Sequence, residues 1–160
     1  MTDFPRLLGA LASAEAEFII VGGLAATIHG GSRLTQAIDV VYDRSDANLA
    51  RLVNALAPYE PHLRGAPHGL SFDWSAATLK RGLNFTLTTT IGDVGLFGEI
   101  AGAGDFAALS AHCTIVPLFG HACRCVDLEA LIRMKRAAGR PKDLEVIAEL
   151  EALAEETRRQ

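Results

Sequence analysis

Two glycines and one aspartate make up the segment of this sequence with the clearest chemical potential. Gly22 and Gly23 follow the apolar run 18–21 and precede a short helical stretch. A helix start that is approached by glycines presents free N–H groups and a positive dipole, which suits a phosphate group. Asp39 lies within a second apolar run, 38–42, where an unpaired buried carboxylate would be costly. Together these features predict a site for a metal-bound nucleoside triphosphate.

The residue two places before Asp39 departs from that prediction. Residues two apart in a strand point to the same side and lie about 6.6 Å apart, so acids at positions 37 and 39 would form a chelating pair. The sequence has Ala37 there instead. One of the carboxylates that a metal-binding strand would need is therefore missing.

Three segments carry a resemblance to a known family. The segment 22–39, GGLAATIHGGSRLTQAID, resembles the Gly-Gly-(spacer)-Arg-x-Thr-x-Asp-x-Asp signature of the polymerase-β-like nucleotidyltransferases, in particular the small bacterial branch that includes abortive-infection and toxin-antitoxin nucleotidyltransferases. The segments GDVGLFGEI (92–100) and IRMKRAAGRPKDLEVI (132–147) are similar to the remaining motifs of that branch. The resemblance covers roughly residues 18 to 155.

The resemblance implies roles for individual positions. In that family the glycine pair contacts the triphosphate, two aspartates of one strand hold two divalent cations, and a third aspartate on a neighbouring strand completes the metal site and activates the attacking hydroxyl. Gly22, Gly23 and Asp39 match by position, whereas the second acid falls on Ala37 and the third on Gly95. Two of the three expected metal-binding carboxylates are thus absent.

This loss bears directly on the expected metal. A charge pair at 4 Å is worth about 4 kcal/mol at an effective dielectric constant near 20, and more for a divalent ion, before desolvation is subtracted. Asp93 lies on the same strand face as Gly95 but about 6.6 Å along the strand, too far to replace it without a bulge or a register shift. We expect Mg²⁺ or Mn²⁺ to bind weakly or not at all, with Asp39 as its ligand and with Asp39 and Asp93 as the remaining candidate catalytic acids.

Four further residues are implied to be nucleotide-binding. By resemblance, Arg33 and Thr35 support the phosphate loop, Lys135 meets the nucleotide phosphates, and Asp143 belongs to the final motif. Lys135 falls on the apolar stripe of its predicted helix, where a charge is unusual unless an anion lies nearby. Each residue also has an ordinary alternative: a lysine can extend from a helix edge to water, and an acid near a helix start stabilises the helix dipole.

Composition sets the class of protein. With 160 residues, 49% hydrophobic and 21% charged, the chain suits one globular domain, 1–160, with a core at about 18–126 and C-terminal helices at about 127–158. The net charge of −4 does not indicate non-specific nucleic-acid binding, and the basic run 133–142 is the one candidate for a local basic patch. There is no signal-peptide pattern and no apolar run long enough for a membrane span, so we expect a cytoplasmic protein without membrane or sequence-specific DNA binding.

The alternation of helical and strand patterns predicts an α/β (α+β) fold, a nucleotidyltransferase-like mixed sheet flanked by helices with a C-terminal helical pair. Periodicity and capping residues place the helices and strands, with an irregular loop at 59–71. The expected helices are 5–16, 24–28, 45–58, 75–81, 105–112, 127–139 and one from 141, and the expected strands are 18–21, 38–42, 84–90, 94–100, 114–119 and 123–126. His121, Cys123 and Cys125 alternate in the sequence, so all three can share one strand face, which allows a metal site, although reduced cysteines are commonly buried for packing alone.

Three functions remain open at this level. The first is a nucleotidyltransferase-fold pseudoenzyme that binds a nucleotide but has impaired or lost NMP transfer. The second is an active transferase of the toxin-antitoxin type that moves an NMP to tRNA or protein, with Asp39, Asp93 and Glu99 as an unconventional metal set. The third is a non-catalytic, antitoxin-like subunit that kept the fold as a surface for a partner protein.

Overall fold

The computed structural model describes residues 1–67 and 69–159, and its centre is a mixed sheet of seven strands in the order β3-β4-β5-β2-β1-β9-β8. The central pairs β2–β5 and β1–β9 are parallel, and the others are antiparallel. The predicted mixed α/β fold is therefore confirmed. The strands of this sheet are β1 (Phe18–Val21), β2 (Ala37–Tyr42), β3 (His62–Leu63), β4 (Asn84–Thr89), β5 (Gly92–Phe97), β8 (Cys113–Leu118) and β9 (His121–Val126).

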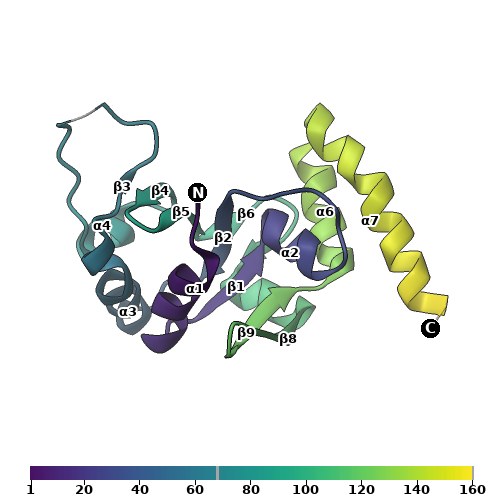
Figure 1. Cartoon of the computed structure of the whole chain (residues 1–160), viewed down its shortest axis with the longest axis horizontal. Helices are drawn as coiled ribbons and strands as arrows, with labels where there is room; N and C mark the ends of the chain where they lie inside the picture. Colours follow the sequence, from purple (N-terminus) through teal and green to yellow (C-terminus); the bar gives the residue numbers. More distant parts are fainter. Residues whose placement is uncertain (68, 160) are drawn as a thin grey trace.

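Helices flank this sheet, and Figure 1 shows α3 and α4 at one end of the molecule and the pair α6 and α7 at the other. Three of the helices expected from the sequence, at 45–58, 105–112 and 127–139, are capped by their first expected residues, because the side chains of Ser45, Asp105 and Asp127 each accept a hydrogen bond from a backbone N–H of the first turn. The helices are α1 (Phe4–Ser13), α2 (Gly22–Ile28), α3 (Asp46–Leu56), α4 (Ala76–Arg81), α5 (Phe106–Leu109), α6 (Leu128–Ala138) and α7 (Pro141–Arg159), with 3₁₀ turns η1 (Ala57–Tyr59) and η2 (Ser110–His112).

The two faces of the sheet differ in character because side chains alternate along each strand. One face is apolar and buried; on β2, β4 and β5 it consists of Ile38, Val40, Phe85, Leu87, Val94 and Leu96. The opposite face of the same three strands carries small and polar residues along most of its length, and it also includes Val41, Asn84 and Phe97 at one end. The small and polar set is Ala37, Asp39, Thr86, Thr88, Asp93 and Gly95. The chemistry-bearing residues of β2 and β5 therefore share this second face.

Two expectations about strands need correction. The stretch 59–71 is not wholly irregular, because β3 lies within it and extends the sheet beyond β4. The strand expected at 94–100 ends at Phe97; Glu99–Ile100 form a separate strand, β6, which pairs with β7 (Gly104–Asp105) in a small second sheet. Two-residue strands leave almost no periodicity in a sequence, so neither could be recognised from the pattern.

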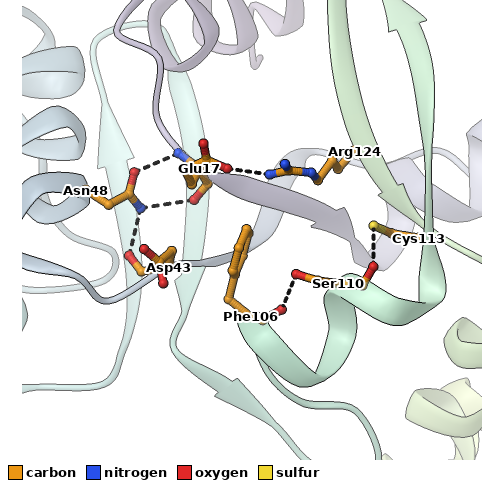
Figure 2. A network of polar contacts seen from close by, with 7 residues as sticks. All are labelled: Glu17, Asp43, Asn48, Phe106, Ser110, Cys113 and Arg124. Atoms are coloured by element: carbon orange, nitrogen blue, oxygen red, sulfur yellow. Dashed lines mark hydrogen bonds and ion pairs between the residues drawn. The ribbon is translucent and has the colours of Figure 1, made fainter.

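A buried asparagine joins the start of β1 to the end of β2, as Figure 2 shows. Asn48 of α3 is fully buried; its amide oxygen accepts from the Glu17 N–H at 2.7 Å, and its nitrogen donates to the carbonyls of Glu17 (3.0 Å) and Asp43 (2.7 Å). The Glu17 carboxylate in turn pairs with Arg124 of β9. These bonds fix β1 and β2 at the ends remote from the glycine pair.

In the part of the chain that the structure describes, no helix combines the length and the apolar character that crossing a membrane requires.

Candidate functional site

Asp39 occupies the middle of the candidate site because β2 lies between β1 and β5. It is opposite Val21 in the antiparallel pair and opposite Gly95 in the parallel pair. Val21 is the last residue of β1 and directly precedes the glycine pair. Register alone therefore brings Asp39, the glycine turn and position 95 together.

The first glycine of the pair, Gly22, lies directly against the Asp39 carboxylate. Gly22 has φ +66°, a left-handed conformation that L side chains rarely adopt, and a Cβ atom built on it would lie 2.8 Å from Asp39 Oδ2. A Cβ on Gly23 would lie 2.7 Å from Oγ1 of Thr35. Both glycines thus allow a close approach, Gly22 to the carboxylate and Gly23 to the loop before β2.

The other oxygen of Asp39 points across to β5. A Cβ atom at position 95 would overlap Asp39 Oδ1 and would lie 2.7 Å from Cε2 of Phe97. The carboxylate therefore fills the space that a side chain at position 95 would enter. An acid at this position could be accommodated only if Asp39 and Phe97 both moved.

Asp93 and Asp39 occupy diagonal positions on the polar face. Asp93 is opposite Ala37, whereas Asp39 is opposite Gly95, so each acid faces a residue without a carboxylate. Asp93 Oδ2 lies 3.7 Å from Nε of Arg64, a residue just beyond β3. Among residues 1–67 and 69–159, no three His, Cys, Asp or Glu side chains lie where together they could hold a metal ion. Within that part of the chain, Glu99 and the alternating His121, Cys123 and Cys125 belong to no such cluster.

Burial and charge act on Asp39 in opposite directions. Burial raises the pKa of Asp39, and the positive charges of Arg64 and Lys135 lower it in part. The two cations approach from different elements, Arg64 from beyond β3 and Lys135 from α6. Asp39 is therefore an acid on which the charges of two protein cations act.

Lys135 and Asp143 form the helical side of the site. Asp143 is 1% exposed and accepts from Arg140 through Nε at 2.6 Å, Nη2 at 3.1 Å and the backbone N–H at 3.2 Å. These hydrogen bonds hold the pKa of the Asp143 carboxyl below its usual range. Lys135 Nζ lies 3.5 Å from Asp143 Oδ1, and 22% of the Lys135 side chain is exposed. Asp143 therefore anchors both basic residues where α6 turns into α7.

Two cavities lie on either side of Lys135. The first, of about 330 Å³, is lined by Gly22, Asp39 and Lys135, together with Asn84, Glu99 and Arg140. The second, of about 150 Å³, is lined by Gly23, Lys135 and the loop residues Arg33 and Thr35. The predicted residues other than Asp93 thus line one or both of two cavities, and Lys135 contributes to both, whereas Asp93 lines neither.

The loop between α2 and β2 is tied to α7 rather than left free. Both the N–H and the hydroxyl of Ser32 donate to Glu149, at 2.8 and 3.0 Å, and Arg33 lies 3.8 Å from Glu145. Thr35 donates its hydroxyl to the carbonyl of Ala37 at 3.0 Å. Arg33 and Thr35 therefore shape the loop, and both line the smaller cavity.

Two residues of the site were not identified from the sequence. In the sequence Arg140 belongs to the basic run 133–142. It also directly precedes Pro141 and lies three residues before Asp143, a pattern that can be recognised as a helix start. Arg64 lies in the stretch expected to be irregular, and no local pattern marks it. Its place follows from strand pairing alone.

Comparison with known proteins supports the fold. No family model matches the sequence, and no curated protein matches it. A candidate nucleotidyltransferase (TM1012) from Thermotoga maritima is similar in structure, with a TM-score of 0.54 and 13% identity over 100% of this chain and 97% of its own. ANT(2'')-Ia, solved in complex with adenylyl-2''-tobramycin, has a TM-score of 0.54 and 18% identity over 98% of this chain and 97% of its own. At these identities the similarity concerns the fold, which is nucleotidyltransferase-like.

Proposed function

We propose that this protein is a nucleotide-binding domain of the nucleotidyltransferase fold in which NMP transfer is impaired or lost. One observation carries the proposal. One cavity is lined by Asp39, Gly22 and Lys135. No carboxylate is present at position 37, two residues before Asp39 on the same strand, or at position 95, opposite Asp39 on β5. The residues that would contact phosphates, Gly22 and Lys135, are thus present, and the carboxylates that would bind metal at positions 37 and 95 are absent.

The contacts support a phosphate ligand next to Lys135. Lys135 lines both cavities, and its ammonium group is only partly neutralised by Asp143, because Asp143 also accepts three hydrogen bonds from Arg140. An ammonium group donates charge-assisted hydrogen bonds to phosphate oxygens. The fold neighbour ANT(2'')-Ia holds an adenylyl-aminoglycoside, which is consistent with a nucleotide in a site of this fold.

Isothermal titration with ATP, CTP, GTP and UTP, each in Mg²⁺, Mn²⁺ or EDTA, tests the proposal. The wild-type protein should bind at least one of them. Lys135→Met should weaken that binding about tenfold or more, since a hydrogen bond to a charged group is worth roughly 1.5–3 kcal/mol. The matched control is Lys80→Met in α4, because the Lys80 side chain is 66% exposed and its ammonium group pairs with Asp46.

Two results would contradict the proposal in different ways. If none of the four nucleotides binds, nucleotide binding is wrong. If RNA or protein is robustly labelled from a radioactive NTP, the loss of transfer is wrong.

Active transfer of the toxin-antitoxin type, from an NTP to tRNA or a protein hydroxyl, is a second candidate. Glu99 lines the same cavity as Asp39, so a second acid is available there, although Asp93 is paired with Arg64 instead. This candidate requires that Asp39→Asn abolish labelling of the acceptor. Labelling that survives in Asp39→Asn would exclude it.

A non-catalytic, antitoxin-like interaction subunit is the third candidate. Leu34 is 99% exposed in the loop before β2, and Leu144 is 57% exposed on α7. Large apolar side chains exposed to this degree are common at protein contacts, although single ones also occur on ordinary surfaces. Co-purification of a partner that Leu34→Ser releases, without any effect of nucleotides on the melting temperature, would favour this candidate over the first.

A further inference from the structure

Arg64 stands in the same row of the sheet as Asp39. Its N–H donates to the Thr86 carbonyl at 3.0 Å, which extends the β3–β4 register by one residue. Thr86 is opposite Gly95, and Gly95 is opposite Asp39. Residues that are directly opposite each other in a sheet point to the same face. Arg64 and Asp39 therefore share the polar face, with only Thr86 and Gly95 between them.

The Arg64 side chain extends over this face toward β5. Its Nε lies 3.7 Å from Asp93 Oδ2, and its Nη2 donates to the Leu87 carbonyl at 3.2 Å. Gly95 has no side chain to separate the guanidinium from Asp39, whose Oδ1 leans over Gly95. The charge of Arg64 accordingly acts on Asp39 as well, lowering its pKa against the effect of burial.

Two protein cations act on Asp39 without an added ion. Asp39 and Asp93 are the acids of β2 and β5 on the polar face, and Arg64 and Lys135 are the cations that act on Asp39. A divalent cation placed at Asp39 would be repelled by both cations, and Ala37 and Gly95 would offer it no side-chain oxygen. The arrangement therefore opposes metal binding by charge as well as by missing ligands.

We propose that Arg64 is the built-in counter-cation of Asp39 and Asp93, that it keeps divalent cations out of this site, and that a phosphate-bearing ligand is bound here without metal. The inference rests on the proposed function for the identity of the ligand only. Arg64 acts through the two carboxylates, so it is a positioning residue.

Titration with MnCl₂ in the absence of nucleotide, followed by electron paramagnetic resonance of free Mn²⁺, tests this role. The wild-type protein should show no saturable site below about 1 mM. Arg64→Gln should bind Mn²⁺ about tenfold or more tightly than wild type, because one positive charge is removed beside two carboxylates. Arg64→Lys, which keeps the charge, should behave as wild type, and so should Arg51→Gln, a change in an exposed arginine of α3 that lines a different cavity.

A second variant assigns the gained site. Asp39→Asn in the Arg64→Gln background should remove the gain, because Asp39 would be the main Mn²⁺ ligand. The proposal is overturned if wild-type protein binds Mn²⁺ below about 1 mM and loses this binding in Asp39→Asn, or if folded Arg64→Gln gains no affinity. Failure of ATP to bind in either Mg²⁺ or EDTA would instead contradict the proposed function, and the Mn²⁺ comparison would still decide the role of Arg64.

Discussion

The carboxylate of Asp39 lies over the backbone of Gly95, in the space that a Cβ atom at position 95 would take. The two residues are directly opposite in the parallel β2–β5 pair. Position 95 therefore faces the carboxylate, and the absence of a side chain there allows Asp39 its present conformation.

Gly95→Ala should destabilise the protein by about 1–3 kcal/mol, because the new methyl group would press against Asp39 and Phe97. The loss of stability should be smaller in an Asp39→Ala background, because the new methyl group would then meet Phe97 but no longer the Asp39 carboxylate. Chemical denaturation of the four proteins in a double-mutant cycle measures this coupling. Equal penalties in the two backgrounds would show that Asp39 does not occupy the space.

Gly22→Ala should lower the free energy of unfolding by about 1–2 kcal/mol or more, because Gly22 has φ +66° and its Cβ would meet Asp39. Gly9→Ala in the interior of α1 is the matched control. Its Cβ would lie 3.6 Å from His121 Nε2, an ordinary contact, so it should stabilise the protein by about 0.5–1 kcal/mol through helix propensity. A neutral Gly22→Ala variant would mean that the turn relaxes at no cost.

Asp39→Asn should raise the free energy of unfolding at neutral pH. Burial raises the folded-state pKa of Asp39 above its unfolded value, so the charged carboxylate destabilises the folded state. This advantage of the variant should shrink as the pH falls through the raised pKa toward about 3.9, because below that the carboxyl is protonated in both states. Urea denaturation between pH 3.5 and 8 gives the profile, and a variant that is less stable at pH 7 would contradict it.

Asp143→Asn should have the opposite effect and cost about 1–2 kcal/mol at pH 7. Hydrogen bonds from Arg140 hold the pKa of Asp143 low in the folded state, so its contribution is complete above the unfolded value of about 3.9 and is lost as the pH falls through the folded-state pKa. The magnitude is modest because 56% of the Arg140 side chain is exposed.

Glu145→Gln is the control for Asp143. Glu145 is also on α7 and is an exposed acid, 3.8 Å from Arg33, so its replacement should change stability by less than about 0.5 kcal/mol at any pH. Equal losses for the two variants would contradict a specific role of the Asp143 carboxylate.

Cys125 should resist alkylation while the protein is folded. It is fully buried, and burial raises its pKa to about 12. At pH 8 the thiolate fraction of Cys125 is therefore roughly one thousandth of that of an exposed cysteine. Iodoacetamide labelling followed by mass spectrometry should modify the partly exposed Cys113 first and Cys125 only after unfolding. Labelling of Cys125 in the folded protein at the rate of a free thiol would contradict this prediction.

Local features of the chain could be predicted from the sequence because they depend on neighbouring residues. The caps at Ser45, Asp105 and Asp127 act within one helical turn, and their hydrogen bonds are present. The apolar run of β1 and the following glycine pair were likewise recognisable from composition. The short strand β3 was missed because two residues have no periodicity.

The relationships that define the site were decided by tertiary structure. The sequence by itself determined that Asp39 stands in an apolar strand after a glycine pair and that positions 37 and 95 have no carboxylate. It did not determine that Arg64 lies 3.7 Å from Asp93, or that Asp39 fills the space above Gly95. These contacts depend on the register of strands that are distant in sequence, and a shift of one residue would turn each side chain to the opposite face of the sheet.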